Sequence, residues 1–332
     1  MAEEKERRTI LGAAIFAAVF ALVMILLTVL AFQYMANRQE RDYRTALGLY
    51  EDGTYEEALT LFSELGGYKD SADRAEACRE HITARKYAEA VSLFEEGEYE
   101  QANELFGSLG DYEDSQDYLE QCGFELRIES YRSAQPGDTI LFGTYEQDGD
   151  PSNGAEEIEW IVLDREEDRI LVISLYGLDS LAFDDDPDRV ETFWYMCSLR
   201  TWLNGSFLST AFREEEREMI PAVTATADLN PDYSFPQGYH AEDQVFLLSI
   251  PEVFEYLGTA RERQCSGTDF CYEQGADRSS GNGCCWWWLR TRGAGGTAIA
   301  AVRADGTVDT YGYGGSYPSY AVRPAMWIDL GS

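Results

Sequence analysis

An uncharged stretch near the N-terminus, residues 10–32, constrains the fold more than any other feature of this sequence. At about 1.5 Å rise per residue, a helix over this stretch measures roughly 34 Å, which is enough to cross a hydrocarbon core of about 30 Å. The stretch is longer than the apolar core of a cleaved signal peptide, and no small-x-small cleavage site follows it. We therefore expect a short tail at residues 1–9 and a transmembrane helix at residues 10–32, rather than a buried core helix.

The charges that flank this helix do not decide its orientation. The positive-inside rule gives a tie, because three basic residues precede the helix and three follow it. A short tail before an anchor favours an N-terminus inside the cell. We therefore expect a single-pass protein whose C-terminal bulk is extracellular. The flanking basic residues are Lys5, Arg7 and Arg8 on one side and Arg38, Arg41 and Arg44 on the other.

The formal net charge of −35 excludes some classes of partner. The tail before the apolar stretch is balanced in charge, so the whole acidic excess belongs to the residues after it. Such a body repels nucleic acid and anionic lipid headgroups, and we expect no nucleic-acid binding. The seven cysteines do not indicate a small-domain disulfide framework, because a soluble part of about 300 residues can bury its own core. Their odd number leaves at least one thiol unpaired within the chain.

An internal repeat follows the apolar stretch. Residues 46–55 recur as residues 90–99, a spacing of 44, and the agreement continues to Cys78 and Cys122. Each unit has apolar positions at helical spacing, a glycine turn and a second helix with Ala and Phe on one face. The pattern G-x-Y-x-x-A-x-x-x-F resembles tetratricopeptide-type repeats, and we assign residues 38–130 to them, with a lengthened helix joining the two units. Cys78 and Cys122 are expected to be small buried side chains rather than a disulfide pair.

The chain changes character after the repeats, where alternating apolar residues, turn residues and aromatics replace the charged helical pattern. Two β-branched runs joined by a polar loop predict a hairpin, and residues 198–212 predict short helices. A capping box from Ser249 to Glu252 predicts the start of a further helix. Asp305-Gly306 between alternating runs predicts a second hairpin. The expected strands are residues 139–145, 158–163, 170–175 and 245–249, and further apolar runs of the final third are residues 286–290, 298–303 and 320–328.

Six ordered motifs carry a family resemblance: GDTILFGTYEQDG, EIEWIVLD, LRTWLNGSF, VFLLSIPE, WWLR and VRPAMWI. Over residues 136–330 they resemble the DUF6273 family of bacterial domains, which implies a bacterial cell membrane but no activity. The layout of the closing part is also similar to C-type-lectin-like domains of the formylglycine-generating-enzyme type and of diversity-generating-retroelement variable proteins. The expected fold class is α+β, with one transmembrane helix, an α-helical repeat segment and a mostly β, lectin-like domain with a few helices.

The sequence offers little support for catalysis. With only His81 and His240, no Ser-His-Asp or Cys-His set can be assembled. There is no phosphate-binding glycine loop and no zinc motif, and the adjacent Cys284 and Cys285 would chelate a metal awkwardly. The acidic residues at 184–188 fit a solvated loop better than a calcium site. We expect no enzyme, no cofactor and no metal, although a pair of carboxylates serving a carbohydrate-active enzyme stays open.

The best candidate site is the segment 283–321, which is rich in Gly, Tyr, Ser and Thr and has no Lys, Glu, Gln or Met. Tyrosines among small residues, held on a rigid scaffold, are typical of adaptable binding surfaces. If the resemblance to retroelement-diversified proteins holds, the four missing residue types are expected, because replacing the adenines of an AAY codon cannot produce them. The alternative is a glycine-rich hairpin of ordinary composition. The candidate ligand-binding residues are Cys284, Cys285, Thr291, Arg292, Thr297, Tyr311, Tyr313, Ser316, Tyr317, Ser319 and Tyr320.

The residues around this segment are interpreted as its scaffold. They are Trp287, Trp288, Leu289, Arg290, Val322, Arg323 and Pro324.

Three functions follow from these patterns. The first is a membrane-anchored surface display protein that binds an extracellular protein or glycan through the C-terminal segment, with the repeats as a spacer. The second is a scaffolding protein of the cell envelope that binds partners through a groove in the repeats. The third is a carbohydrate-active enzyme that uses paired carboxylates.

Overall fold

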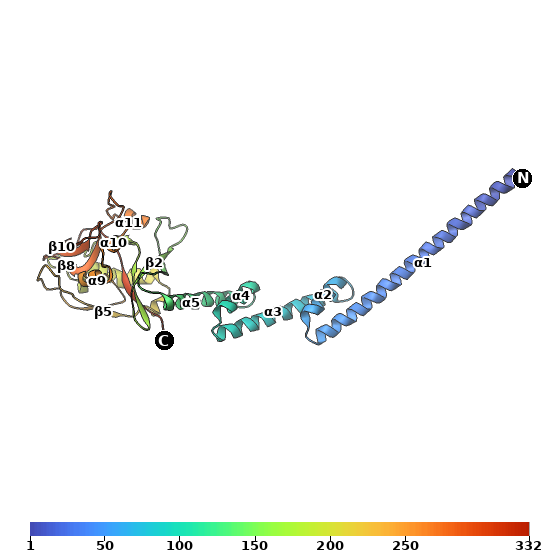
Figure 1. Ribbon diagram of the computed structural model, residues 1–332, viewed down its shortest axis with the longest axis horizontal. Coiled ribbons are helices and arrows are strands. Elements are labelled where there is room, and N and C mark those ends of the chain that lie inside the picture. Colours follow the sequence, from blue (N-terminus) through green and yellow to red (C-terminus); the bar gives the residue numbers. More distant parts are fainter. Residues whose placement is uncertain (332) are drawn as a thin grey trace. The chain divides into compact units, whose positions relative to one another are not determined.

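The computed structural model describes residues 1–331, and the side chains of residues 2–10 and 12–14, including most of the expected N-terminal tail, lie outside the described part. The chain divides into two compact units, Met1–Leu126 and Arg127–Ser332. The first unit is helical, and the second combines strands with short helices (Figure 1). The α+β class is therefore confirmed.

The first unit begins with α1, a continuous helix of 50 residues, Ala2–Glu51 (Figure 1). In the described part of the chain, α1 is the helix that is long and apolar enough to cross a membrane, and none of its apolar window is buried. Phe16 and Leu22 are 74% and 70% exposed. The apolar stretch therefore has no packing partner among the described residues, which argues against a core helix.

The helices expected in each 44-residue unit are confirmed. α2 (Tyr55–Leu65) and α4 (Tyr99–Leu109) have the same length and the same place in the repeat. The 25-residue helix α3 (Ser71–Glu95) joins the two repeats, as the sequence predicts. α5 (Ser115–Ser133) follows α4. Helices of 11 residues are marginal alone, so the packing of their apolar faces must stabilise them.

Each repeat has its own small core. The first contains Phe62 and Cys78, and the second contains Phe106 and Cys122, all with no exposed surface. Both thiols are free, so their expected role as small buried side chains is confirmed. Because a few residues make up each core, each repeat depends strongly on its central phenylalanine.

The same tyrosine hydrogen bond closes both repeats. The hydroxyl of Tyr43 donates to Asp70, and the hydroxyl of Tyr87 donates to Asp114. These carboxylates raise the pKa of both tyrosines, that of Tyr87 to about 12. The bond ties the first helix of each repeat to the start of its third.

A third tyrosine continues this spacing at the end of α5. Tyr131 lies 44 residues after Tyr87, and Ala134 lies 44 residues after the buried Ala90. Tyr131 donates its hydroxyl hydrogen to the carbonyl of Leu141, and both Tyr131 and Ala134 belong to the core of the second unit. The Tyr-x-x-Ala pattern at the start of each repeat thus occurs a third time. Here its two side chains pack against strands instead of helices.

The second unit contains two five-stranded sheets. In the first, the order is β1-β2-β3-β12-β7, and all neighbours are antiparallel. β2 buries alternate residues, whereas β3 is buried along almost its whole length. The predicted hairpin is β2 with β3. The strands are β1 (Thr139–Tyr145), β2 (Glu156–Arg165), β3 (Arg169–Ser174), β7 (Val245–Phe246) and β12 (Ala325–Asp329).

The second sheet has the order β10-β9-β8-β11-β4. Its neighbours are antiparallel except for β8 with β11. The predicted Asp305-Gly306 hairpin is β9 with β10. The strands are β4 (Asp179–Ser180), β8 (Trp287–Arg292), β9 (Ala298–Val302), β10 (Val308–Gly314) and β11 (Ala321–Val322).

Short elements complete the unit. The predicted capping box at Ser249 and Glu252 opens α9 (Ile250–Tyr256). The short helices expected at 198–212 are present as α6, η2 and α7. The remaining elements are η1 (Trp194–Met196), α6 (Ser198–Trp202), η2 (Leu203–Phe207), α7 (Leu208–Ala211), α8 (Glu214–Glu218), β5 (Val223–Ala225), β6 (Ala241–Asp243), α10 (Ala260–Arg263) and α11 (Asp269–Glu273).

Candidate functional site

Five of the eleven predicted ligand-binding residues lie in the core. These five are between 0% and 8% exposed, so their assignment to a binding face is wrong. β8 is buried at all six positions because strands flank it on both edges and other elements cover both its faces. The buried residues are Cys284, Cys285, Thr291, Arg292 and Tyr320.

Thr291 and Arg292 hold the scaffold together. The hydroxyl of Thr291 accepts a hydrogen bond from the backbone N–H of Ile250 at 3.0 Å. Arg292 donates to the carbonyl oxygens of Pro236 at 2.7 Å and Gly296 at 2.9 Å. These bonds attach the start of α9 and the loops at Pro236 and Gly296 to the end of β8. The two side chains therefore hold the scaffold in place and do not face a ligand.

Three predicted tyrosines are exposed. Tyr311 is 63% exposed, Tyr313 40% and Tyr317 52%. The first two lie on β10, and Tyr317 lies on the loop between β10 and β11. Of the other predicted residues, Ser316 is exposed, whereas Thr297 and Ser319 are half-buried.

An aromatic cluster lies among these residues. It comprises Trp286, Tyr313 and Tyr317, which we call the aromatic surface, and the buried Tyr320 beneath them. The ring centre of Trp286 lies 5.3 Å from that of Tyr313 and 5.3 Å from that of Tyr320. Tyr320 also lies 5.7 Å from Tyr313 and 5.8 Å from Tyr317. The buried Tyr320 therefore supports three rings that are half-buried or exposed.

Tyr311 belongs to a different group. Its ring lies 5.9 Å from that of Tyr233, which comes from the loop between β5 and β6. The exposed tyrosines therefore form two separate groups: Tyr313 and Tyr317 contact Tyr320, whereas Tyr311 contacts Tyr233.

The sequence interpretation missed Trp286. Trp286 and Trp288 both contact Tyr320, while the Trp287 indole donates to the carbonyl of Arg263. Successive side chains of an extended chain point to opposite faces, so Trp286 and Trp288 lie on one face and Trp287 lies on the other. This alternation was the signal that could have identified Trp286.

An ion pair borders the aromatic surface. The guanidinium of Arg303 lies 5.3 Å from the ring centre of Trp286 and contacts the carboxylate of Asp309 at 2.5 Å. This pair raises the pKa of Arg303. The surface therefore offers ring faces for apolar groups and, beside them, the half-exposed guanidinium of Arg303 as a charged donor.

A bulge interrupts β10 beside the two exposed tyrosines. The pairing of β10 with β9 shifts between Asp309 and Tyr313. Gly312 lies in the bulge with a φ of +79°, and a Cβ there would lie 2.5 Å from the carbonyl oxygen of Ile299. Asp309 accepts the Gly312 backbone N–H at 3.1 Å. Tyr311 and Tyr313 lie on either side of Gly312 in this edge strand, and both are exposed.

We expect Gly293→Ala to displace β10. A Cβ at Gly293 would lie 2.1 Å from the carbonyl oxygen of Tyr311, which also accepts the backbone N–H of Ala294 at 2.8 Å. Such overpacking should lower the free energy of unfolding by about 1–3 kcal/mol. Denaturant unfolding measures this loss. Gly205→Ala is the control, because a Cβ there meets no atom within 4 Å.

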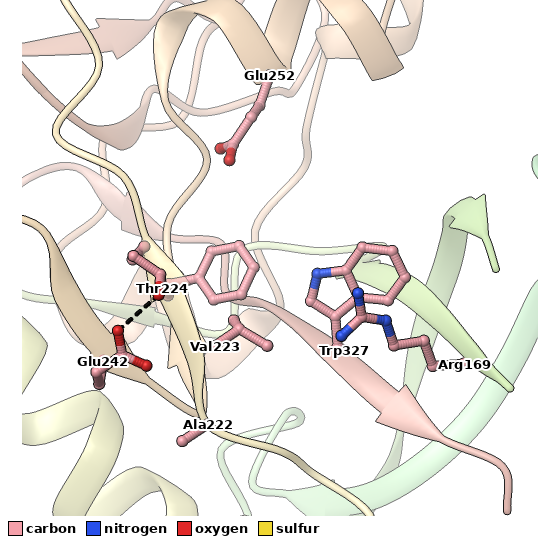
Figure 2. A pocket seen from close by; sticks show the side chains of 9 residues that line it. Arg169, Ala222, Val223, Thr224, Glu242, Glu252 and Trp327 are labelled. Carbon is pink, nitrogen blue, oxygen red and sulfur yellow. Dashed lines mark hydrogen bonds between the residues drawn. The ribbon is translucent and has the colours of Figure 1, made fainter.

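A polar pocket of about 400 Å³ lies elsewhere in the second unit (Figure 2). On one side the guanidinium of Arg169 lies 4.4 Å from the ring centre of Trp327. Glu242, bonded to the Thr224 hydroxyl at 2.6 Å, and Glu252 line other parts of the pocket (Figure 2). Its size is within the range of small-molecule sites.

The two carboxylates of this pocket are not equivalent. Glu252 accepts the Ser249 backbone N–H at 2.8 Å and binds Arg290 through both oxygens. These bonds cap α9 and neutralise the carboxylate. Glu242 keeps an oxygen that is free of protein partners among the described residues. The pocket therefore presents one available carboxylate, whereas glycoside hydrolysis normally requires two.

The acidic groups nearest to a possible metal site are bound to neighbouring protein groups. Asp184, expected in a solvated loop, is 2% exposed and accepts from Arg189 at 2.8 Å, so that expectation is wrong for this residue. Glu146, Asp148 and Glu156 have oxygen atoms within 4.8 Å of one another, the spacing of a possible metal site. Glu146 and Glu156 already accept backbone N–H groups of the same loop at 2.7 Å.

The fold and these contacts define an α+β domain with an exposed aromatic surface. Residues 167–330 match the family model of DUF6273, a domain of unknown function, and the C-terminal domain of this chain belongs to that family. β1 and β2 precede the matched range but lie in the same sheet as β3 and β12. No curated protein and no solved structure matches the chain.

Proposed function

We propose that this chain is a single-pass protein of the bacterial cell membrane that presents its DUF6273 domain to the outside as a ligand-binding module. The apolar part of α1 is the anchor. The net charge of −35 favours a domain held away from anionic lipid headgroups. The aromatic surface is the binding face, and its ligand is an extracellular protein or a glycan.

One observation carries this proposal. Tyr313 and Tyr317 are 40% and 52% exposed, yet both rings rest on the buried Tyr320. Tyrosines have few rotatable bonds, and support from below reduces the entropy lost when a ligand orders them. Their hydroxyls and the guanidinium of Arg303 add hydrogen-bonding groups at the edge. Supported aromatic rings with a polar rim are typical of binding hot spots.

We expect the double variant Tyr313→Ala/Tyr317→Ala to weaken ligand binding about tenfold or more, as loss of hot-spot side chains does. A panel of immobilised glycans and extracellular proteins supplies the ligands, and surface plasmon resonance measures the dissociation constants. Phe254→Ala is the matched control, because this side chain on α9 is 49% exposed and has no contact with the aromatic surface. Equal affinity in the double variant and the control would disprove this assignment of the binding face.

The competing scaffolding function uses the helical repeats, and a deletion distinguishes the two. The display function requires that a chain lacking residues 136–332 no longer binds the ligand. If binding survives on the repeats alone, the repeats are the binding module.

The outward orientation is tested separately on intact cells. Protease added outside should degrade the C-terminal domain while leaving a cytoplasmic marker intact. A protected C-terminal domain would place the bulk of the chain inside the cell.

Diversification by a retroelement is part of this proposal, and burial limits the positions it could use. Random substitution at Cys285, Thr291 or Arg292 would damage the core, whereas Tyr311, Tyr313 and Tyr317 tolerate change. A reverse transcriptase gene and a near-copy of the codons for residues 283–321, differing only at adenines, should lie near this gene. Their absence from the genomic neighbourhood would exclude it.

A further inference from the structure

Four of the seven cysteines lie close together in the second unit. Cys265 comes from the segment between α10 and α11, Cys271 lies within α11, and Cys284 and Cys285 lie just before β8. All four are buried and free. A Cβ placed on Gly177 would lie 3.5 Å from the sulfur of Cys271 and 3.6 Å from that of Cys285, which shows how near the two segments approach.

Cys265 and Cys285 make the closest contacts of the group. The backbone N–H of Cys285 donates to the carbonyl of Cys265 at 2.8 Å, and the Cys285 thiol lies 3.3 Å from the same oxygen. The two thiols also hydrogen-bond to each other. These contacts make Cys265 and Cys285 direct neighbours in the fold, as a disulfide between them requires.

A buried cation lies beside this pair. Arg323 is 1% exposed and donates through Nε to the carbonyl of Ser174 at 2.9 Å. Its Nη1 has no hydrogen-bond partner, and it forms no ion pair with a carboxylate among the described residues. A buried guanidinium needs a compensating negative charge, and the sulfur of Cys265 is close enough to interact with it electrostatically.

The two thiols differ in acidity. Burial alone would raise the pKa of Cys265, but the hydrogen bond from Cys285 and the charge of Arg323 outweigh it and lower the pKa to about 7. The pKa of Cys285 is raised, chiefly by its hydrogen bond to Cys265 and then by burial. Cys265 is therefore the more acidic of the two thiols, and a thiolate is the form that attacks disulfides.

The other two cysteines are less suited to pairing. The Cys271 thiol donates to the carbonyl of Asp179 at 3.2 Å, and burial raises its pKa. The Cys284 sulfur lies 3.9 Å from the hydroxyl of Ser266 and points to a different neighbour from that of Cys285. The Cys284 sulfur contacts Ser266 and Asn282, whereas the Cys285 sulfur contacts Cys265 itself, so Cys285 is the better placed partner.

We propose that Cys265 and Cys285 are a disulfide-forming site, which closes when the domain meets a disulfide oxidant such as oxidised glutathione. Because Cys265 and Cys285 are 2% and 0% exposed, the reaction takes place when the segment before α11 opens locally. The thiolate of Cys265 then attacks the glutathione disulfide, forms a mixed disulfide and releases one glutathione thiolate. Cys285 then loses its proton and displaces the second glutathione. One S–S bond forms in the protein, one breaks in the oxidant, and two electrons and two protons pass to glutathione. The bond ties the segment that leads into β8 to the segment before α11.

The test uses the full chain in detergent, equilibrated with oxidised glutathione and then alkylated. We expect five alkylated thiols instead of seven, and a tryptic cross-link between peptides 264–278 and 279–290. Cys265→Ser and Cys285→Ser should abolish the cross-link, whereas Cys271→Ser and Cys284→Ser should retain it. These four variants are needed because each peptide contains two cysteines.

Thermal unfolding gives a second readout. Closing a loop of this length should raise the Tm of the oxidised chain by about 6–12 °C, and Cys271→Ser should show the same rise. Cys265→Ser should show none. A cross-link that depends on Cys271 or Cys284 overturns the proposal. So does a chain that keeps seven alkylated thiols under conditions that oxidise dithiothreitol.

Discussion

Arg290→Met should lower the free energy of unfolding of the C-terminal domain by about 3–5 kcal/mol, the usual cost of breaking a buried ion pair from one side. Arg290 is 4% exposed and donates to Glu252 at 2.7 Å, to Asp228 at 3.1 Å and to the carbonyl of Leu247 at 2.7 Å. Methionine fills a similar volume but leaves two carboxylates without their cation and a buried carbonyl without its donor.

Calorimetry should show this loss as a fall in Tm of roughly 10 °C for a domain of this size. Arg169→Met is the matched control, since the Arg169–Glu166 pair is 35% and 48% exposed and solvent screens it. We expect the control to change stability by less than about 1 kcal/mol. If the two variants melt alike, Arg290 is not the structural centre that its contacts indicate.

Phe62→Ala and Phe106→Ala should each unfold one helical repeat and leave the other folded. Both side chains are fully buried, and each lies at the centre of a separate small core. Removing a buried phenylalanine typically lowers stability by about 3–5 kcal/mol. So small a core contributes little free energy of folding beyond this amount, so the helices of the affected repeat should unfold locally.

Hydrogen exchange measured by mass spectrometry locates the opening. Phe62→Ala should deprotect α2, and Phe106→Ala should deprotect α4. Glu57→Ala and Gln101→Ala are the controls, because they are exposed on the same two helices and 44 residues apart. Simultaneous deprotection of both helices in either phenylalanine variant would show that the repeats are one cooperative unit.

Much of the fold could be predicted from local patterns. The 44-residue spacing predicted two helical units of the same design, and the capping box predicted the start of α9. Alternating apolar residues predicted both hairpins. These features depend on neighbours within a few residues, where the periods of helix and strand determine which side chains share a face.

The use of Tyr131 was not predictable in the same way. Its spacing from Tyr87 marks the start of a third repeat, but the helices that should follow are replaced by strands. Tyr131 donates a hydrogen bond through its hydroxyl, as Tyr43 and Tyr87 do. Its acceptor is the carbonyl of Leu141, whereas theirs are carboxylates. The 44-residue spacing therefore locates the tyrosine in the sequence but does not predict which group its hydroxyl binds.

The candidate site separates what the sequence determined from what only the tertiary structure decided. Composition alone located a segment rich in tyrosine and glycine, and Asp305-Gly306 predicted the hairpin that carries part of it. Whether a side chain in that segment is exposed depends on which strands lie beside it and which loops cover it. β8 lies inside the sheet and is buried along its whole length, so Arg292 belongs to the core, whereas β10 lies at the edge of the sheet and Tyr313 is exposed. The alternation that separates Trp286 from Trp287 is local, but only contact with Tyr320 made Trp286 part of a surface. Burial is a property of the assembled sheets, and local sequence determines only which faces are available to be buried.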